Sequence, residues 1–261
     1  MKVTSKIPVM TAIVFLITLV VPVWKSSVTL YGTAFLNNTA QAQLPVEIYQ
    51  TYPEAMEEPV ADPLESYNRV IFQFNDKFYF WVVKPVGTAY GKVVPEVARI
   101  GLRNAFHNFL SPARFANNLL QLKFEGAGVT LARFLLNSTF GFAGFYDFTA
   151  KQCTFAKEPY EEDFGQTLGH YGMPPVVYIV WPILGPSNFR DTIGIAGDAF
   201  MEPTYYLPIS WYTAGGIKAG QYLNAASLHI GDYEDFLQAA LDPYVAMRNG
   251  YNQYRENEIK K

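Results

Sequence analysis

The stretch "DPLESYNRVIFQFNDKFYFWVVKP", residues 62–85, decides the fold because it predicts a long helix with little polar surface. Asp62 fits the N-cap, Pro63 the first helical position and Glu65 the third, which together form a capping box with the favoured proline. Apolar side chains then recur at helical spacings of three and four residues: Leu64, Tyr67, Ile71, Phe74, Phe78 and Trp81. We expect the helix to end near Val83, because the residue before a proline is driven away from the helical conformation.

A second row of side chains runs beside the first and holds two asparagines seven residues apart: Asn68, Phe72, Asn75 and Tyr79. The predicted helix therefore has more than one apolar face. Such a helix either lies at the centre of a core or touches lipid.

The composition of the whole chain raises the same question. Half of the 261 residues are hydrophobic and 16% are aromatic, whereas only 16% are charged. An ordinary soluble domain has about 25% charged residues. So few charges predict a large apolar or aromatic surface, which usually marks a partner, a ligand groove or a membrane contact. A well-packed aromatic core is the alternative.

Charge and cysteine content exclude several classes of protein. Residues 1–42 hold three lysines and no acidic residue, which leaves 17 basic and 23 acidic residues and a formal charge of −6 for the remainder. This balance argues against nucleic-acid binding, which needs clustered basic residues to neutralise phosphates. Cys153 is the single cysteine, so neither an intramolecular disulfide nor a multi-cysteine metal site is possible.

The N-terminus predicts export. Two lysines precede the uncharged run 7–24, as in a secretory signal, and Ala40-Gln41-Ala42 offers a cleavage site, so residues 1–42 form the expected signal peptide. The run 7–24 could instead stay as an uncleaved membrane anchor. Either interpretation predicts that residues 43–261 are exported to the far side of the membrane. The absence of a cysteine near the end of the apolar run excludes lipid attachment there.

The remaining chain predicts one mostly helical domain over residues 62–255, after an irregular arm at 43–61. Ser111-Pro112 and Asp242-Pro243 both have the cap-plus-proline pattern that begins a helix. The run "AGVTLARFLLNSTFGFAGFYDF" predicts an apolar helix broken at Gly141 and Gly144. Its Arg133 is the only charge before Asp147, and an arginine in such a setting usually pairs with a carboxylate or with backbone carbonyls. The run "VVYIVWPIL", 176–184, alone favours a strand, and its proline confines that strand to an edge or a loop.

No catalytic or metal-binding pattern is present in the sequence. It lacks the nucleophile elbow, the zinc-protease motif, the phosphate loop and the dinucleotide fingerprint. The three histidines are widely separated, at His107, His170 and His229. The acidic run Glu161-Glu162-Asp163 is interpreted as a solvated loop. We therefore expect no enzyme activity, no cofactor and no bound metal.

The segment "FGQTLGHYG", residues 164–172, has the composition of an active site but lacks partners for one. Gly165, Gly169 and Gly172 suit turns or a close approach of backbones. His170, flanked by glycine and tyrosine, is usually a hydrogen-bonded structural residue, and contact with a ligand is the alternative. We interpret the segment as a rigid, irregular piece of chain that shapes the fold.

Five motifs in order give the chain a resemblance to a known family. They are "DPLESYNRVIFQFN", "FLLNSTFGFAGFYD", "FGQTLGHYG", "GPSNFRD" and "DPYVAMRNGY". The chain resembles the MlaA (VacJ) family over roughly residues 60–255, nearly all of the exported part.

The resemblance implies an all-α, ring-shaped domain embedded in the inner leaflet of the Gram-negative outer membrane, with an amphipathic central channel. Members of that family take mislocalised phospholipids from the outer leaflet and pass them to a soluble periplasmic carrier, which maintains lipid asymmetry. They work beside trimeric porins and catalyse no covalent change. Few charges and many aromatic residues suit such a ring, because tyrosine and tryptophan favour the membrane interface.

The resemblance also suggests roles for particular residues. Asn68, Asn75 and Arg133 are candidates for a polar channel wall or for buried support, since they lie on otherwise apolar helices. Gly141 and Gly144 are candidates for a hinge that gates the channel. Most members carry a lipid-modified cysteine at the mature N-terminus, which this chain lacks. Attachment would then rest on the aromatic ring or on an uncleaved 7–24 segment, and the latter would place the protein at the inner membrane.

Two other functions stay open from the sequence. A periplasmic scaffold or binding module would use the aromatic surface for protein partners. A secreted lipid hydrolase would need catalytic groups that meet only in three dimensions.

Overall fold

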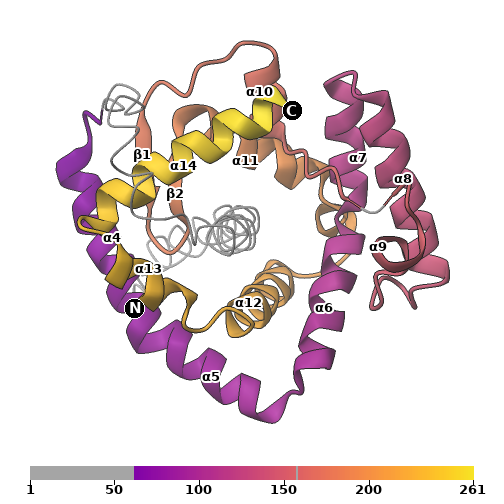
Figure 1. The fold of residues 1–261 in the computed structure, drawn as a ribbon, viewed down its shortest axis with the longest axis horizontal. Helices are drawn as coiled ribbons and strands as arrows, with labels where there is room; N and C mark the ends of the chain where they lie inside the picture. The colour runs from indigo at the N-terminus through magenta and orange to yellow at the C-terminus, as the bar shows by residue number, and fades with distance from the viewer. Residues whose placement is uncertain (1–61, 157) are drawn as a thin grey trace, which may run out of the picture.

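The computed structural model describes residues 62–156 and 158–261 and arranges them as a ring of helices (Figure 1). The expected signal peptide, anchor segment and irregular arm lie outside the described residues. The elements, in chain order, are α4 (Glu65–Phe78), the π-helical turn η1 (Tyr79–Val83), α5 (Lys84–Val93), α6 (Glu96–Phe109), α7 (Ser111–Leu120), α8 (Phe124–Thr139), α9 (Phe148–Gln152), α10 (Phe164–His170), β1 (Tyr178–Trp181), β2 (Gly185–Asn188), α11 (Phe189–Met201), the 3₁₀ turn η2 (Pro203–Tyr206), α12 (Trp211–Ser227), α13 (Asp232–Ala239) and α14 (Pro243–Lys260).

The first helices follow one another around the ring in chain order: α4, α5, α6 and α7 run from the left of the view along the bottom and up the right, and α10 and α11 lie at the top (Figure 1). Helix α13 then lies near α4, and α14 closes the ring between α4 and α10. Helix α12 lies inside the ring and is seen nearly end-on. The expected mostly helical, ring-shaped fold is confirmed, and one short hairpin is added to it.

The first helix does not end near Val83, so that prediction is wrong. The chain stays helical through η1 into α5, with Pro85 in the first turn of α5. The amide of Lys84 donates to the carbonyl oxygen of Tyr79, five residues earlier. A proline in an ordinary α-helix would clash with the preceding turn and remove a hydrogen bond. The wider π turn directly before it lets the helix continue past the proline.

Asp62 is not the N-cap of this helix, which is a second correction. The cap position is Leu64, and it makes no side-chain capping bond. The Asp62 carboxylate instead accepts hydrogen bonds from Asn68 Nδ2 at 2.9 Å and from the Tyr244 hydroxyl. Contacts with α14, remote in sequence, have replaced the local cap.

Of the two other predicted caps, one agrees with the structure. Helix α7 begins at Ser111 itself, so the expected Ser111 cap is wrong: the cap position is Leu110, and it makes no side-chain capping bond. Asp242 caps α14 by accepting from the amides of Tyr244 and Val245. Helix α8 ends at Thr139, and the glycine-containing turn that follows includes Gly144 at a φ of +90°.

The β-favouring run forms half of a hairpin. Strand β1 pairs antiparallel with β2, with Tyr178 opposite Asn188 and Trp181 opposite Gly185. As expected, Pro182 lies in the connecting turn. A small apolar cluster packs where the hairpin meets α14: Tyr178, Val180, Tyr244 and Tyr251.

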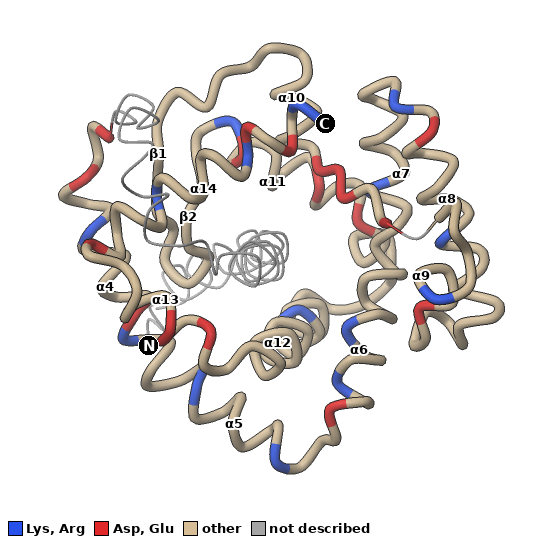
Figure 2. Tube along the Cα trace, viewed as in Figure 1, with Lys and Arg blue, Asp and Glu red and all other residues tan. Residues whose placement is uncertain are grey.

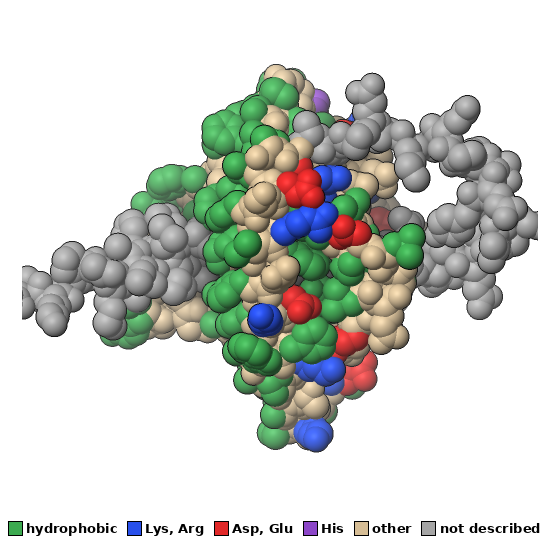
Figure 3. Space-filling model, turned by 90° about the vertical axis from the view of Figure 1, so that its left-hand side faces the viewer, with side chains coloured by type: hydrophobic (Ala, Val, Ile, Leu, Met, Phe, Trp, Pro, Cys, Tyr) green, Lys and Arg blue, Asp and Glu red, His purple; other side chains and the backbone are tan. Residues whose placement is uncertain are grey.

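Burial in this ring is inverted relative to a water-soluble domain. Of the described residues, 22 buried side chains are polar or charged and only 9 are apolar, while 34 large hydrophobic residues are exposed. Soluble proteins bury mainly apolar residues and rarely bury charged ones. Figure 3 shows apolar side chains gathered toward one face of the ring, whereas the charged side chains lie at the centre and on the other side of the view. No helix within residues 62–156 or 158–261 has both the length and the hydropathy needed to cross a bilayer.

Candidate functional site

The two asparagines of α4 attach this helix to the hairpin. Asn68 donates to the carbonyl oxygen of Tyr178 at 3.1 Å and accepts from the amide of Val180 at 2.8 Å. Asn75 makes the same pair of bonds two turns later, donating to Trp181 at 3.0 Å and accepting from Ile183 at 2.6 Å. An amide side chain carries both a donor and an acceptor, so each asparagine satisfies one backbone carbonyl and one backbone amide.

We expect Asn68→Leu to lower the free energy of unfolding by about 2–3 kcal/mol, because a buried carbonyl and a buried amide lose their partners. Asn68 is fully buried. Equilibrium denaturation in detergent would measure the loss. Gln73→Leu, on an exposed position of the same helix, is the matched control, and it should change stability by no more than about 0.5 kcal/mol. Equal effects from the two variants would contradict the assigned bonds.

Arg133 of α8 holds the chain that follows the helix. Its guanidinium donates to the carbonyl oxygen of Ala156 at 2.6 Å and to Asp147 Oδ2 at 2.7 Å. Asn137, one turn further, donates to Asp147 Oδ1 at 3.0 Å and accepts from the amide of Thr149. Burial alone would raise the pKa of Asp147, but the Ala150 amide and the Arg133 guanidinium outweigh it and lower that pKa.

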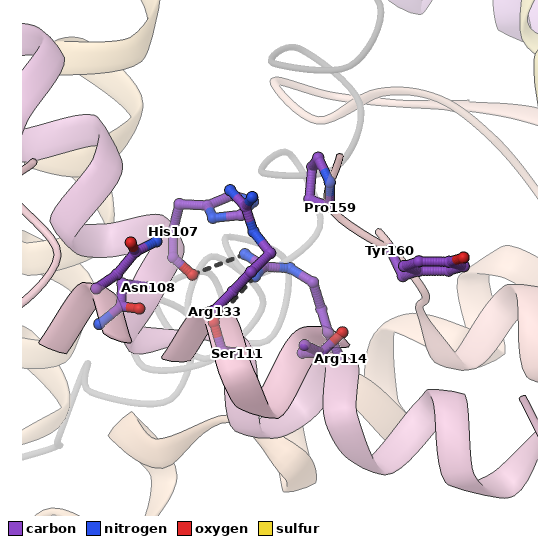
Figure 4. A pocket seen from close by; sticks show the side chains of 9 residues that line it. His107, Asn108, Ser111, Arg114, Arg133, Pro159 and Tyr160 are labelled. Carbon is purple, nitrogen blue, oxygen red and sulfur yellow. Dashed lines mark hydrogen bonds between the residues drawn. The ribbon is translucent and has the colours of Figure 1, made fainter. Parts of the chain in front are cut away.

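A small polar pocket lies where α6, α7 and α8 meet the chain at 159–160 (Figure 4). Arg114 and Arg133 point into the same space beside His107. Glu161 is bonded to His107 and to Arg114, the latter at 2.9 Å. Burial alone would raise the pKa of Glu161, but Arg114 and His107 hold it well below its ordinary value.

The acidic run 161–163 is not a solvated loop, so that interpretation is wrong. Glu162 is buried and pairs with Lys123 at 2.8 Å, while Glu161 pairs with Arg114. In Figure 2 this run lies between α10 and α7, next to basic residues from other helices. The counter-charges come from more than 35 residues away in sequence, so the local sequence gave no signal for them.

The segment "FGQTLGHYG" is mostly a short helix, which corrects the expected irregular conformation. Helix α10 covers its first seven residues, and Asp163 caps it by accepting from the Gln166 amide at 2.7 Å. A Cβ atom at Gly165 would lie 2.6 Å from Asp191 Oδ1, and one at Gly169 would lie 2.6 Å from Ile259 Cδ1. Both positions therefore allow α10 to pack closely on α11 and α14. Gly172 follows the helix at a φ of +85°.

Arg255 of α14 binds two aspartates from different helices. It makes a bidentate pair with Asp163, at 2.6 Å and 2.9 Å, and two bonds to Asp191, both at 2.8 Å. All three side chains are largely buried. Burial alone would raise the pKa of Asp191, but the Arg255 and Arg190 guanidiniums hold it at about 2. This cluster, the Arg255 network, joins α10, α11 and α14.

Asp198 lies beside the Arg255 network but pairs with no cation in the contacts of the described residues. It accepts from the Phe164 amide at 3.0 Å and from Asn117 Nδ2 at 3.1 Å. Burial and the neighbouring Asp163 raise the pKa of Asp198 to about 8. The group is therefore mostly protonated at neutral pH.

The remaining predicted site residues lie apart from these clusters. His170 is exposed, and its ring makes an edge-to-face contact with the ring of Tyr171. Gly141 packs against the carbonyl oxygens of Tyr146 and Asn137, and Gly144 against the Asn108 side chain. The sequence candidates did not include the residues at the centre of the buried ion-pair clusters, Arg114, Asp191 and Arg255. An isolated basic or acidic residue in a sequence does not reveal a distant partner. No cluster of metal-ligating side chains occurs among residues 62–156 and 158–261.

These buried polar contacts hold the ring together from within, and its apolar side chains stay outside.

Comparisons with known proteins agree with this architecture. A family model described as MlaA lipoprotein matches residues 60–258. The chain is 32% identical to the intermembrane phospholipid transport system lipoprotein MlaA of Escherichia coli, over 74% of this chain and 76% of that protein. The Haemophilus influenzae protein of the same name gives the same values.

Two further proteins are similar to this chain. An uncharacterised protein of Rickettsia prowazekii is 29% identical over 77% of this chain and 79% of its own length. A structure solved for the structural basis of maintenance of bacterial outer membrane lipid asymmetry superposes with a TM-score of 0.66 at 30% identity. That match covers 76% of this chain and 99% of the other.

Proposed function

We infer the function of this chain from the family to which it belongs, the MlaA lipoproteins: it transports phospholipid between membranes and so maintains the lipid asymmetry of the outer membrane. The observation that carries this proposal is the inverted burial of the ring. Exposed apolar side chains are unfavourable in water and favourable against acyl chains, whereas buried polar groups need the partners that they have here.

The ring sits within one leaflet in this proposal. Its apolar face lies among acyl chains and its charged face meets water, as the distribution in Figure 3 favours. A phospholipid would pass through the ring with its headgroup against polar side chains and its acyl chains in hydrocarbon. Such a path avoids moving a charged headgroup through hydrocarbon, which is very costly.

We assign Asn68, Asn75 and Arg133 to support of the ring. The side chain of each one makes hydrogen bonds to the backbone or to a carboxylate of the same chain. Gly141 and Gly144 remain candidates for gating, because they lie in the turn between α8 and α9. Normal outer-membrane asymmetry in cells that carry a proline at either position would contradict that role.

The proposed partners and location of the protein follow from its proposed role in phospholipid transport. We propose that the protein acts at the inner leaflet of the outer membrane, beside a trimeric porin, and passes phospholipid to a soluble periplasmic carrier without covalent change. The exposed apolar side chains of the ring would supply the attachment to the membrane, with an uncleaved 7–24 segment as the alternative. Extraction of the native protein by carbonate washing would contradict this attachment.

Deletion of the gene in its host tests the proposed function. We expect more phospholipid in the outer leaflet, measured as phospholipid that an added phospholipase can reach on intact cells, and a return to normal when the full chain is restored. An unchanged outer leaflet would reject transport. Lipid analysis of the purified chain separates the alternatives: a transporter carries intact phospholipid, a scaffold carries none, and a hydrolase releases fatty acid from added phospholipid.

A further inference from the structure

Four turns of the ring place a large apolar residue in the left-handed backbone region. In the β1–β2 turn, Ile183 at a φ of 67° is half-buried, whereas the residues in the other three turns are exposed. Leu122 has a φ of 59°, Phe142 of 52° and Val176 of 58°. Residues other than glycine and asparagine rarely adopt this region, because Cβ approaches the backbone too closely, and the conformation is least favourable for β-branched residues such as valine. A turn of this kind at a water-exposed tip would ordinarily carry glycine or asparagine.

These three side chains are also strongly exposed. The exposed fractions are 64% for Leu122, 83% for Phe142 and 64% for Val176. In water, each of these residues therefore has two unfavourable features: a strained backbone conformation and an exposed apolar side chain. Residues held in strained conformations cluster where the strain serves a function.

The three turns lie at the outer edge of the ring (Figure 1). They join α7 to α8, α8 to α9, and α10 to β1. Each has a further exposed aromatic residue close by in sequence: Phe124 at 68%, Phe140 at 62% and Tyr171 at 66%. The apolar tips are thus spread along the rim and are not confined to one patch.

We propose that Leu122, Phe142 and Val176 are insertion points that enter the acyl chains of the surrounding leaflet and fix the depth of the ring in it. The inference rests on the proposed membrane function and goes beyond it by assigning the contact to three turns. Hydrocarbon makes the exposed side chain favourable and thereby offsets the strained backbone. Glycine or asparagine would relieve the strain but would give up the contact with lipid.

Depth measurements on the full chain test the insertion directly. In a Cys153→Ser background, Leu122→Cys, Phe142→Cys and Val176→Cys would each carry an environment-sensitive fluorophore, with Lys260→Cys, an exposed site near the end of α14, as control. In vesicles of phosphatidylethanolamine and phosphatidylglycerol, we expect acyl-chain spin labels to quench the three tip fluorophores. Aqueous iodide should quench only the control. Iodide quenching of the tips to the extent of the control would overturn the proposal, whereas failure of the whole protein to bind vesicles would instead reject the proposed membrane function.

A matched pair of substitutions separates lipid contact from backbone strain. Phe142→Asn and Ala143→Asn place the same residue in the same turn, and both positions have a positive φ, but Ala143 has no large side chain to lose. The measured quantity is the rise in Tm when vesicles are added. Only lipid contacts that the folded ring makes contribute to this rise. An N-terminal anchor would bind lipid in the folded and the unfolded chain alike, so it would not raise the Tm. We expect Phe142→Asn to weaken the vesicle affinity of the folded state about tenfold, and Ala143→Asn to leave it unchanged. Equal rises in Tm for Phe142→Asn and the unsubstituted protein would overturn the proposal.

Discussion

Arg255→Met is expected to lower the free energy of unfolding by about 3–5 kcal/mol, because removal of one member of a buried ion cluster leaves the other charges unpaired. Asp163 and Asp191 together take four hydrogen bonds from this guanidinium. Without Arg255, neither aspartate can replace these hydrogen bonds with bonds to water unless the contact between α10, α11 and α14 opens. Chemical denaturation in detergent, followed by circular dichroism, would measure the loss.

Two further variants define the cause. Arg255→Lys keeps the charge but cannot bind both carboxylates with fixed geometry, so its loss should be intermediate. Lys260→Met, on the exposed side of the same helix, should change stability by less than about 0.5 kcal/mol. If Arg255→Met and Lys260→Met unfold at the same denaturant concentration, the Arg255 network does not hold the helices together.

Asp198→Asn is expected to stabilise the ring at neutral and alkaline pH. The pKa of Asp198 is about 8 in the folded chain, against an ordinary value of 3.8. Between these values the folded state holds a proton that the unfolded state has released. Stability therefore falls as pH rises through this window, by at most about 1.4 kcal/mol per pH unit from this group. Asparagine keeps the acceptor for Phe164 and Asn117 and removes the ionisation.

The measurement is the free energy of unfolding of both proteins from pH 5 to pH 9 in the same detergent. The unsubstituted protein should lose stability across this range, and Asp198→Asn should show a flatter profile that lies above it at the alkaline end. Asp163→Asn is the contrasting control, because it removes a partner of Arg255 and should destabilise at every pH in the range. Parallel profiles for Asp198→Asn and the unsubstituted protein would contradict the raised pKa.

Local signals in the sequence predicted the structure where the local interaction is also the final one. Asp242 caps α14 as expected, and α7 starts within one residue of the expected position although Ser111 does not cap it, because a proline in the first turn needs no distant partner. The same reasoning failed at Asp62, whose carboxylate binds Asn68 and Tyr244 instead of capping the nearby helix. It failed again at Val83, because a π turn is an alternative that the proline rule does not include.

The polar clusters could be predicted only in part. The sequence indicated that Asn68, Asn75 and Arg133 are unusual, because a polar residue on an apolar helix must find a partner. It could not name the partners, since Asn68 and Tyr178 are 110 residues apart. Arg255 and Asp163, separated by 92 residues, gave no signal at all, because a single charge near the end of a polar helix looks solvated. The resemblance of ordered motifs to a family carried the functional prediction further than any residue pattern.

The closure of the ring has a consequence for how the chain is made. Helix α14 meets α4 through Arg69 and Asp242, whose side chains lie 2.9 Å apart, and through Tyr244, which contacts Asp62. The earliest and the latest described helices are thus neighbours, although the contacts that join them are 173 and 182 residues apart in sequence. The ring can therefore close only after both helices have been synthesised, and long-range contacts of this kind form slowly. A chain whose apolar side chains are exposed before closure is prone to aggregate.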